Sequence, residues 1–251
     1  MKMINVGILI IATNRYYDYV DPLLQSVKKY FLVVPGYNIQ PFVFTNQSSS
    51  ATQGAIQFSI KHLPWPMMTL LRYRIFIEHR QYLEKMDYLY YCDADMRLVG
   101  EVGKEILGTT VGTIHPLFYD KPREMLVGYE GRPESRAYIS IGKGKRYYAG
   151  GFLGGVSKDF LSLATVIADS IDDDLERGVI AKWHDESHLN RYYADNPPSI
   201  ELSPSYCYPE DMSLPFEKKI ICLKKKHVHM RAELSLFSQA IRLFKQKIIR
   251  R

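Results

Sequence analysis

The chain has 251 residues, 46% of them hydrophobic and 24% charged, with a net charge of +6 at pH 7. This length and composition exclude a disordered or collagen-like chain and predict one large globular domain or two small ones. No run approaches the ~20 apolar residues of a membrane span, and three cysteines without metal-type spacing argue against a disulfide framework, so we expect a reducing compartment.

The positive charge is concentrated at the C-terminal end of the chain. Residues 218–251 contain 11 Lys and Arg and one Glu, a net charge of +10, whereas residues 1–217 contain 22 basic and 26 acidic residues, a net charge of −4. Such an asymmetry indicates a polyanionic partner, which can be a phosphate group, a nucleic acid or a membrane surface.

In chain order, strands alternate with helices. The apolar run 6–12 is too short for a signal peptide and belongs to a first strand at 5–12. A helix to about residue 30, a strand at 42–45, a loop at 46–54, a helix at about 68–85 and a strand at 88–92 follow. The glycine- and tyrosine-rich stretch 112–155 suggests loops and short strands around a site. Helices are expected at 161–177, at 184–194 and, as an amphipathic tail, at 232–251. This alternation predicts an α/β fold with a sheet flanked by helices.

A pair of carboxylates follows the predicted strand at 88–92. Asp93 and Asp95 are separated only by Ala94, and two carboxylates at the end of a buried strand can hold Mn²⁺ or Mg²⁺ together with a diphosphate. The alternative to a metal site is an ordinary turn at the end of the strand. The run Asp172-Asp173-Asp174 contains the same spacing, but it lies in a predicted exposed helix, so we interpret it as a solvated charge run.

The segment from Trp183 to Asn190 gathers polar and aromatic side chains within about two helical turns. In a helix, Glu186 and Asn190 share one face, as do His184 and His188. The two histidines lack a third ligand for zinc. A catalytic carboxylate at Glu186 is the preferred interpretation, and a surface helix is the alternative.

Two further segments have the composition of a ligand site. Residues 147–155 contain four glycines, which permit close approach of the backbone to a ligand or form a tight hairpin. The cluster Lys224-Lys225-Lys226-His227, with Arg231, is suited to clamping a phosphate group. A solvated or lipid-bound basic tail is the alternative.

Taken in order, these segments resemble the histo-blood-group ABO glycosyltransferases (glycosyltransferase family 6) and their bacterial relatives. The resemblance covers about residues 4–231. It rests on Asp93-Ala94-Asp95, Gly112 to Pro116, Gly131 to Ile139, Tyr147 to Gly155, Trp183 to Asn190 and Leu202-Ser203-Pro204. It implies a GT-A type catalytic domain at 1–231, with a mixed central sheet, and a separate basic amphipathic helix at 232–251.

The resemblance also assigns roles to individual residues. It implies Glu186 as the catalytic carboxylate and Asp93 and Asp95 as ligands of Mn²⁺, or of Mg²⁺. The implied donor-binding residues are Ile11, Ala12, Thr13, Tyr16, Arg72, Asp93, Ala94, Asp95, Ala149, Gly150, Gly151, Asp185, Lys225 and Arg231. The implied acceptor-binding residues are His115, Trp183, Glu186 and, with an alignment shifted by about one residue, Glu210. The basic segment around Lys225 and Arg231 would close over the diphosphate.

The implied reaction is retaining transfer of GalNAc from UDP-GalNAc to a galactoside in α-1,3 linkage. Glycine at position 151 leaves room for the N-acetyl group, and UDP-Gal is the alternative donor. Fucα1-2Gal is the implied acceptor. Retention proceeds through a covalent intermediate on Glu186 or through front-face attack, and the sequence does not separate the two.

Two features suggest a cellular setting. The first strand begins at once, so we expect a bacterial-type, cytoplasmic enzyme. The apolar stripe and basic residues of 232–251 suggest contact with the inner face of the cell membrane and a lipid-linked acceptor, such as a lipopolysaccharide precursor. A nucleic-acid-binding module is the remote alternative, but residues 1–217 are acidic and no such signature is present. A sugar-binding protein without catalysis is disfavoured by the intact Asp93, Asp95 and Glu186.

Overall fold

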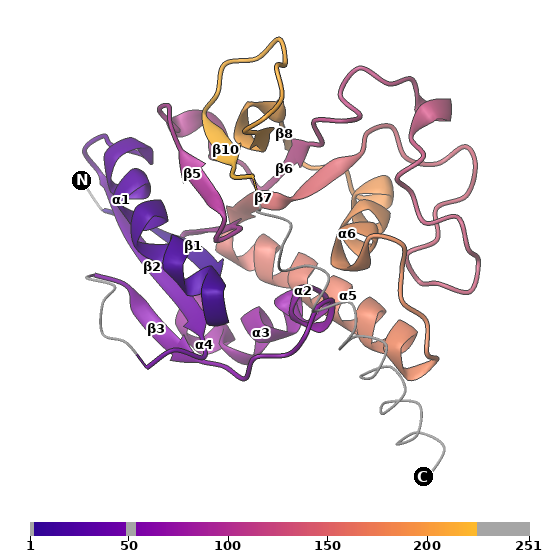
Figure 1. Ribbon diagram of the computed structural model, residues 1–251, viewed down its shortest axis with the longest axis horizontal. Helices are drawn as coiled ribbons and strands as arrows, with labels where there is room; N and C mark the ends of the chain where they lie inside the picture. Colours follow the sequence, from indigo (N-terminus) through magenta and orange to yellow (C-terminus); the bar gives the residue numbers. More distant parts are fainter. Residues whose placement is uncertain (1–2, 49–53, 225–251) are drawn as a thin grey trace.

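The protein is a mixed α/β domain built on a central seven-stranded sheet (Figure 1). The computed structural model describes residues 3–48 and 54–224. The strand order is β3-β2-β1-β4-β7-β6-β8, and a small second sheet has the order β5-β10-β9. None of the helices in these two ranges has the length and apolar character that a membrane span requires. The α/β fold class expected from the sequence is confirmed.

The elements have the following bounds. The strands are β1 (Ile4–Ile11), β2 (Tyr37–Thr45), β3 (Ile56–Ser59), β4 (Tyr88–Cys92), β5 (Met96–Leu98), β6 (Thr110–Ile114), β7 (Tyr148–Val156), β8 (Ile200–Leu202), β9 (Tyr208–Pro209) and β10 (Ile220–Cys222). The α-helices are α1 (Val20–Tyr30), α2 (Met67–Leu70), α3 (Arg72–Glu78), α4 (Arg80–Leu83), α5 (Ser157–Glu176) and α6 (His184–Asp195). Short 3-10 helices are η1 (Asn14–Tyr19), η2 (Lys104–Ile106), η3 (Arg123–Met125) and η4 (Pro204–Tyr206).

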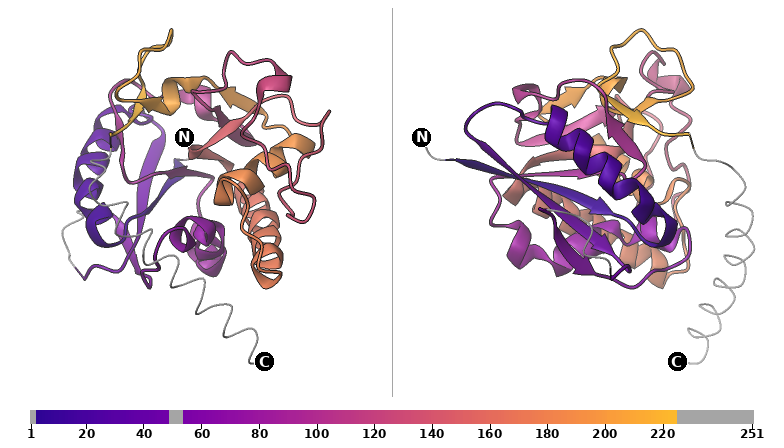
Figure 2. Two further views of the ribbon diagram at one scale, coloured as in Figure 1. Left: turned by 45° about the vertical axis from the view of Figure 1, so that its right-hand side comes forward. Right: turned by 60° about the vertical axis from the view of Figure 1, so that its left-hand side comes forward.

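The central sheet is apolar on both faces because each face is covered by other elements. In β1, Ile8 and Ile10 pack into a core with α1 and the small sheet, whereas Leu9 packs into a second core with α3, α5 and α6. Successive side chains of a strand point to opposite faces, so one apolar run can supply both cores. The views in Figures 1 and 2 show α1 on one side of the sheet and the long α5 on the other.

The order of the strands brings several strand ends together at one edge. β1 pairs in parallel with β2 and β4, so their carboxyl ends lie side by side, and β7 runs antiparallel between β4 and β6. In open sheets of this kind, ligands bind outside the carboxyl ends of the parallel strands. Thr13, which follows β1, and Asp93, which follows β4, therefore share one edge.

The glycine-rich stretch is a central strand and not a hairpin. All of β7 except its last residue is buried. A Cβ atom at Gly154 would lie 2.3 Å from the ring of Tyr90, whose buried hydroxyl donates to the carbonyl of Ile106. The second half of the glycine-rich stretch is therefore required for packing between strands, and only its first half is left to serve a site.

One expected helix and one strand differ from the structure. The helix expected at 68–85 is divided into α2, α3 and α4, with breaks at Leu71 and His79. The His79 ring nitrogen Nδ1 lies 2.8 Å from the carbonyl oxygen of Ile75. In a continuous helix this carbonyl would instead accept the backbone N–H of His79. The strand β3 falls in a region that the sequence analysis left without an element.

The interpretation of Asp172-Asp173-Asp174 as a solvated charge run is wrong for Asp174. Asp174 is only 1% exposed, and its carboxylate accepts hydrogen bonds from the Ser135 hydroxyl at 2.5 Å, the Arg136 backbone N–H at 2.8 Å and the Arg177 guanidinium at 2.6 Å. A buried carboxylate with three donors joins the 116–147 segment to α5. Asp172 is half-exposed and pairs with Arg74.

Replacement of Asp174 should therefore destabilise the fold more than replacement of its neighbour. Asp174→Ala leaves buried donors without a partner, and we expect a loss of about 3 kcal/mol in the free energy of unfolding. Asp172→Ala removes a surface ion pair and should cost at most about 1 kcal/mol. Urea denaturation of both variants measures the difference. Equal losses would show that Asp174 does not anchor the segment.

Candidate active site

Arg72, the first residue of α3, joins three elements at the carboxyl edge of the sheet. It is 6% exposed. Its Nη1 donates to the Gly150 carbonyl at 2.6 Å, its Nη2 lies 3.4 Å from Asp93 Oδ1, and its Nε lies 3.3 Å from Asp185 Oδ2. The guanidinium also lies over the ring of Tyr91, 4.1 Å from its centroid. One buried cation thus holds together strand β7, the Asp93 loop and α6.

Asp93 is held by protein donors through one of its carboxylate oxygens. Oδ1 accepts the Tyr91 hydroxyl at 2.5 Å and faces Arg72. The Asp93 side chain remains about one-third exposed, whereas Asp95 is nearly buried. Within the described residues, no cluster of three potential ligands from His, Cys, Asp and Glu is present. Two oxygen donors suit a hard cation that takes its remaining ligands from a diphosphate and water.

Helix α6 is attached to strand β7 through side chains that replace a neighbouring strand. Asn190 Oδ1 accepts the backbone N–H of Tyr148 at 2.8 Å, and Asn190 Nδ2 donates to the carbonyl of the same residue at 2.8 Å. Strand β4 pairs with β7 only as far as Phe152, so Tyr148 lies beyond the end of β4 and has a strand partner only in β6. One turn earlier on α6, Glu186 Oε2 accepts the Gly150 N–H at 2.8 Å. The shared face of Glu186 and Asn190 is confirmed.

Glu186 is half-buried and is held by a donor on each carboxylate oxygen. Besides Gly150, the Tyr147 hydroxyl donates to Oε1 at 2.9 Å. Burial raises the pKa of Glu186 to about 7, and the two hydrogen bonds limit the rise because they favour the ionised form. Burial likewise raises the pKa of Asp185 to about 6, against the opposing effect of Arg72. Carboxyl groups with pKa values near neutrality are frequent at catalytic sites.

An aromatic cluster connects Glu186 to His115. The Tyr147 ring packs against Phe118 at 4.8 Å and stands edge-on to His115 at 5.5 Å. Burial lowers the pKa of His115 to about 4, so the ring is neutral. Its Nδ1 accepts the Leu117 N–H at 3.1 Å, which places the proton on Nε2. His115 therefore offers an N–H donor on the side of the site expected to bind the acceptor.

The residues expected to receive the nucleotide follow β1. Ala12 and Thr13 are buried and Tyr16 is exposed. The Ala12 N–H donates to the Phe44 carbonyl, and Thr13 Oγ1 lies 2.9 Å from His62 Nδ1. Ile11 ends the strand itself.

The remaining expected site residues are linked less directly to the contacts of Arg72 and Glu186. Trp183 precedes α6 and is 51% exposed, and the His184 ring next to it stands edge-on to Trp65 at 4.8 Å. His188 is buried with Nδ1 2.8 Å from the Ser170 hydroxyl, so the two histidines do not form a zinc pair. Glu210 accepts the Lys224 N–H at 2.9 Å. Lys225, Arg231 and the expected helix at 232–251 lie outside the described residues.

Tyr147 and Tyr91 are parts of the site to which the sequence analysis gave no role. Both are tyrosines in apolar runs, where a core role is the usual interpretation. Only their carboxylate partners, Glu186 and Asp93, distinguish them. Two signals in the sequence were available: Tyr147 directly precedes the glycine-rich strand, and Tyr91 lies two residues before Asp93.

Comparisons with known proteins agree with this arrangement. The model of the family "Glycosyltransferase family 6" matches residues 1–232. The rat histo-blood group ABO system transferase 1 is 31% identical over 240 residues, which is 90% of this chain and 68% of the rat protein. The human globoside alpha-1,3-N-acetylgalactosaminyltransferase 1 is 29% identical over 87% of this chain and 65% of its own length. The mouse glycosyltransferase 6 domain-containing protein 1 is 33% identical over 84% and 70%.

The Tyr147 hydroxyl should lower the pKa of Glu186 by its hydrogen bond to the ionised form. A hydrogen bond to a charged group contributes about 1.5–3 kcal/mol, which corresponds to about one pKa unit or more. In Tyr147→Phe the pKa of Glu186 should therefore rise from about 7 by about one unit. NMR titration of protein labelled at glutamate carboxyl carbons measures it, with Glu186→Gln for assignment.

Tyr148→Phe is the matched control, because that hydroxyl donates to Glu201 and not to Glu186. It should leave the titration of Glu186 unchanged. An unshifted titration in Tyr147→Phe would show that the phenol does not stabilise the carboxylate.

Proposed function

The chain belongs to glycosyltransferase family 6, and from this premise we propose that it moves GalNAc from UDP-GalNAc to a galactoside in α-1,3 linkage. We propose further that the configuration at the anomeric carbon is retained. The observation that carries the proposal is the carboxylate of Glu186, held by Tyr147 and Gly150 beside the Arg72–Asp93 pair. Retaining transfer requires one carboxylate fixed at the reacting carbon and a separate group for the leaving diphosphate.

The donor diphosphate would meet Asp93 and Asp95 through a divalent cation, for which we propose Mn²⁺. The carboxylate oxygens of these two residues, beyond the carboxyl end of β4, are ligands that suit such an ion. When bound, the cation neutralises the leaving diphosphate. Arg72 and the Tyr91 hydroxyl keep Asp93 oriented through its Oδ1. The nucleoside would lie along Ile11 to Tyr16, where the adjacent β1 ends.

Glu186 would act on the anomeric carbon in its ionised form. It would attack that carbon directly or stabilise its positive charge while the acceptor hydroxyl enters from the same face. Because the pKa of Glu186 is raised to about 7 by burial, the ionised fraction and hence the rate should fall as the pH falls below that value. Neutral His115 would hold an acceptor hydroxyl as a hydrogen-bond donor through its Nε2–H.

Gly151 supports GalNAc as the transferred sugar. A Cβ at this position would lie 2.6 Å from Met96 Cε and 3.1 Å from Asp93 Oδ2. Position 151 therefore has no room for a side chain, and an added methyl group would displace Met96 or Asp93 toward the space where we propose that the N-acetyl group binds. The names of the globoside GalNAc-transferases among the relatives agree with this donor. UDP-Gal remains the alternative.

The acceptor we propose is Fucα1-2Gal, in line with the similarity to an ABO transferase. The basic segment from Lys224 onward would close over the diphosphate; it leaves the sheet where the Leu223 N–H donates to the Asp95 carbonyl at 2.9 Å. We further propose that residues 232–251 contact the inner face of a cell membrane, that the acceptor is lipid-linked and that the enzyme is cytoplasmic. Nucleic acid is not part of it.

The reaction is tested by the release of UDP from UDP-GalNAc and UDP-Gal. We expect release that is stimulated by a Fucα1-2Gal acceptor and faster from UDP-GalNAc. Release should require Mn²⁺ and disappear in EDTA, with Asp93→Asn losing most of the Mn²⁺-stimulated rate. The matched substitution Asp172→Asn should have no effect. Full activity in EDTA would contradict the metal role, and no release from either donor would contradict the proposed reaction.

The steric account of donor choice is tested at Gly151. Gly151→Ala should shift the ratio of kcat/KM values toward UDP-Gal by about tenfold, as a clash worth about 1.4 kcal/mol would. The double variant Gly151→Ala with Met96→Ala keeps the new methyl group but removes the side chain that it would displace. A shift that persists in the double variant comes from the methyl group itself. An unchanged ratio in both variants would refute the steric account.

A further inference from the structure

A strained apolar loop protrudes between α1 and β2, far from the proposed active site. Phe31 and Leu32 are 2% exposed, whereas Val33 is 62% and Val34 is 42% exposed. Leu32 has a φ of +47°, in the left-handed region that non-glycine residues rarely adopt. Its N–H donates to the Val102 carbonyl at 2.7 Å. The chain thus accepts backbone strain at a leucine while it turns two valines into solvent.

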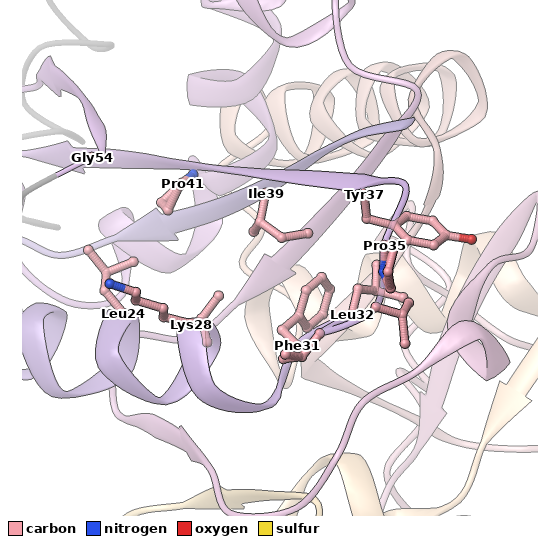
Figure 3. A pocket seen from close by; sticks show the side chains of 12 residues that line it. Leu24, Lys28, Phe31, Leu32, Pro35, Tyr37, Ile39, Pro41 and Gly54 are labelled. Carbon is pink, nitrogen blue, oxygen red and sulfur yellow. The ribbon is translucent and has the colours of Figure 1, made fainter. Parts of the chain in front are cut away.

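Behind the loop lies an open apolar groove of about 650 Å³ between α1 and β2 (Figure 3). Its lining continues from the loop onto the helix and the strand, through Leu24, Val27, Phe31, Tyr37 and Ile39. Isolated apolar side chains on a surface are ordinary. Here the exposed valines are continuous with an apolar groove, and such a contiguous patch marks an interaction surface.

Three lysines belong to elements that form or adjoin this patch, and one of them, Lys28, lines the groove itself. Lys28 and Lys29 lie in the last turn of α1, and the Lys104 ammonium lies 6.0 Å from the centroid of the Tyr37 ring. Among the described residues, ion pairs of lysine within 4.0 Å involve Lys121, Lys143, Lys219 and Lys224, and none of the three. The adjacent Glu105 is neutralised by Lys219 at 2.7 Å. The patch therefore combines protruding apolar side chains with positive charge that has no internal counter-ion.

We propose that this patch, formed by loop 31–36 with Lys28, Lys29 and Lys104, docks the protein on an anionic lipid bilayer. The valines would enter the interface between headgroups and acyl chains, and the lysines would contact anionic headgroups. A protein partner would need an apolar pocket surrounded by acidic residues. An anionic bilayer has an apolar interior beneath negatively charged headgroups at every point of its surface. The proposal does not depend on residues 225–251.

The position of the patch leaves the active site accessible. The Gly36 carbonyl accepts the N–H of Ile4, and Tyr37 is paired with Ile4, so the loop lies at the amino ends of β1 and β2. The proposed donor site follows the carboxyl ends of β1 and β4. The eight residues of β1 at about 3.3 Å each separate the two ends. Docking through the patch would leave the opposite, carboxyl ends of these strands uncovered by the bilayer.

Direct contact with lipid is tested by a fluorescent label whose emission reports polarity. Val34→Cys carries the label in the patch, and Val166→Cys carries it at an equally exposed apolar position on α5. Wild-type protein treated in parallel corrects for the native Cys222, which is half-buried. On vesicles of phosphatidylcholine with phosphatidylglycerol, the label at 34 should shift to the blue and the label at 166 should not. Phosphatidylcholine alone should give a much smaller shift.

The energetic contribution is tested by sedimentation with the same vesicles. Val33→Asp with Val34→Asp should weaken binding about tenfold or more, while Val166→Asp binds as wild type and transfer to a soluble acceptor is unchanged in both. A label at 34 that stays in water on bound protein, or a double variant that binds as the control, would overturn the proposal. A blue shift that depends on protein concentration without vesicles would indicate contact between copies of the chain, and would also overturn it.

Discussion

The attachment of α6 to β7 is the constraint on which the site depends. Asn190 supplies the donor and acceptor that a neighbouring strand would give to Tyr148, and Glu186 accepts the N–H of Gly150. Buried backbone groups must be paired, so the part of β7 that extends beyond the end of β4 requires these two side chains. The same bonds fix the position of Glu186 relative to the sheet edge, so the packing of α6 and the placement of the proposed catalytic group depend on one set of contacts.

Electrostatics connects this attachment to the donor side. Asp185, Glu186 and Asp93 bring three carboxylates around one buried cation, Arg72, which contacts two of them directly. Burial raises the pKa values of Asp185 and Glu186 toward neutrality, so their charged forms are costly in the free protein. A divalent cation bound with the diphosphate would relieve the repulsion among these carboxylates. The site is thus suited to a charged ligand that arrives with its own counter-ion.

The sequence indicated the fold class and the centre of the site because both depend on short-range patterns. The apolar run before Asp93 predicted β4, and the i, i+4 spacing predicted the shared face of Glu186 and Asn190. Contacts between distant segments were not accessible: the bond from Tyr147 to Glu186 joins residues 39 positions apart. Asp174 was misassigned for the same reason, since its partners Ser135 and Arg136 come from another segment.

The most direct test of this account is Glu186→Gln. Glutamine keeps an oxygen that can accept the Gly150 N–H, but it lacks the charge and nucleophilicity that the reaction requires. We expect glycosyl transfer to fall by orders of magnitude, while the affinity for UDP with Mn²⁺, measured by calorimetry, stays within about twofold. Turnover near that of the wild type, with UDP bound normally, would contradict the role of Glu186 as the catalytic carboxylate.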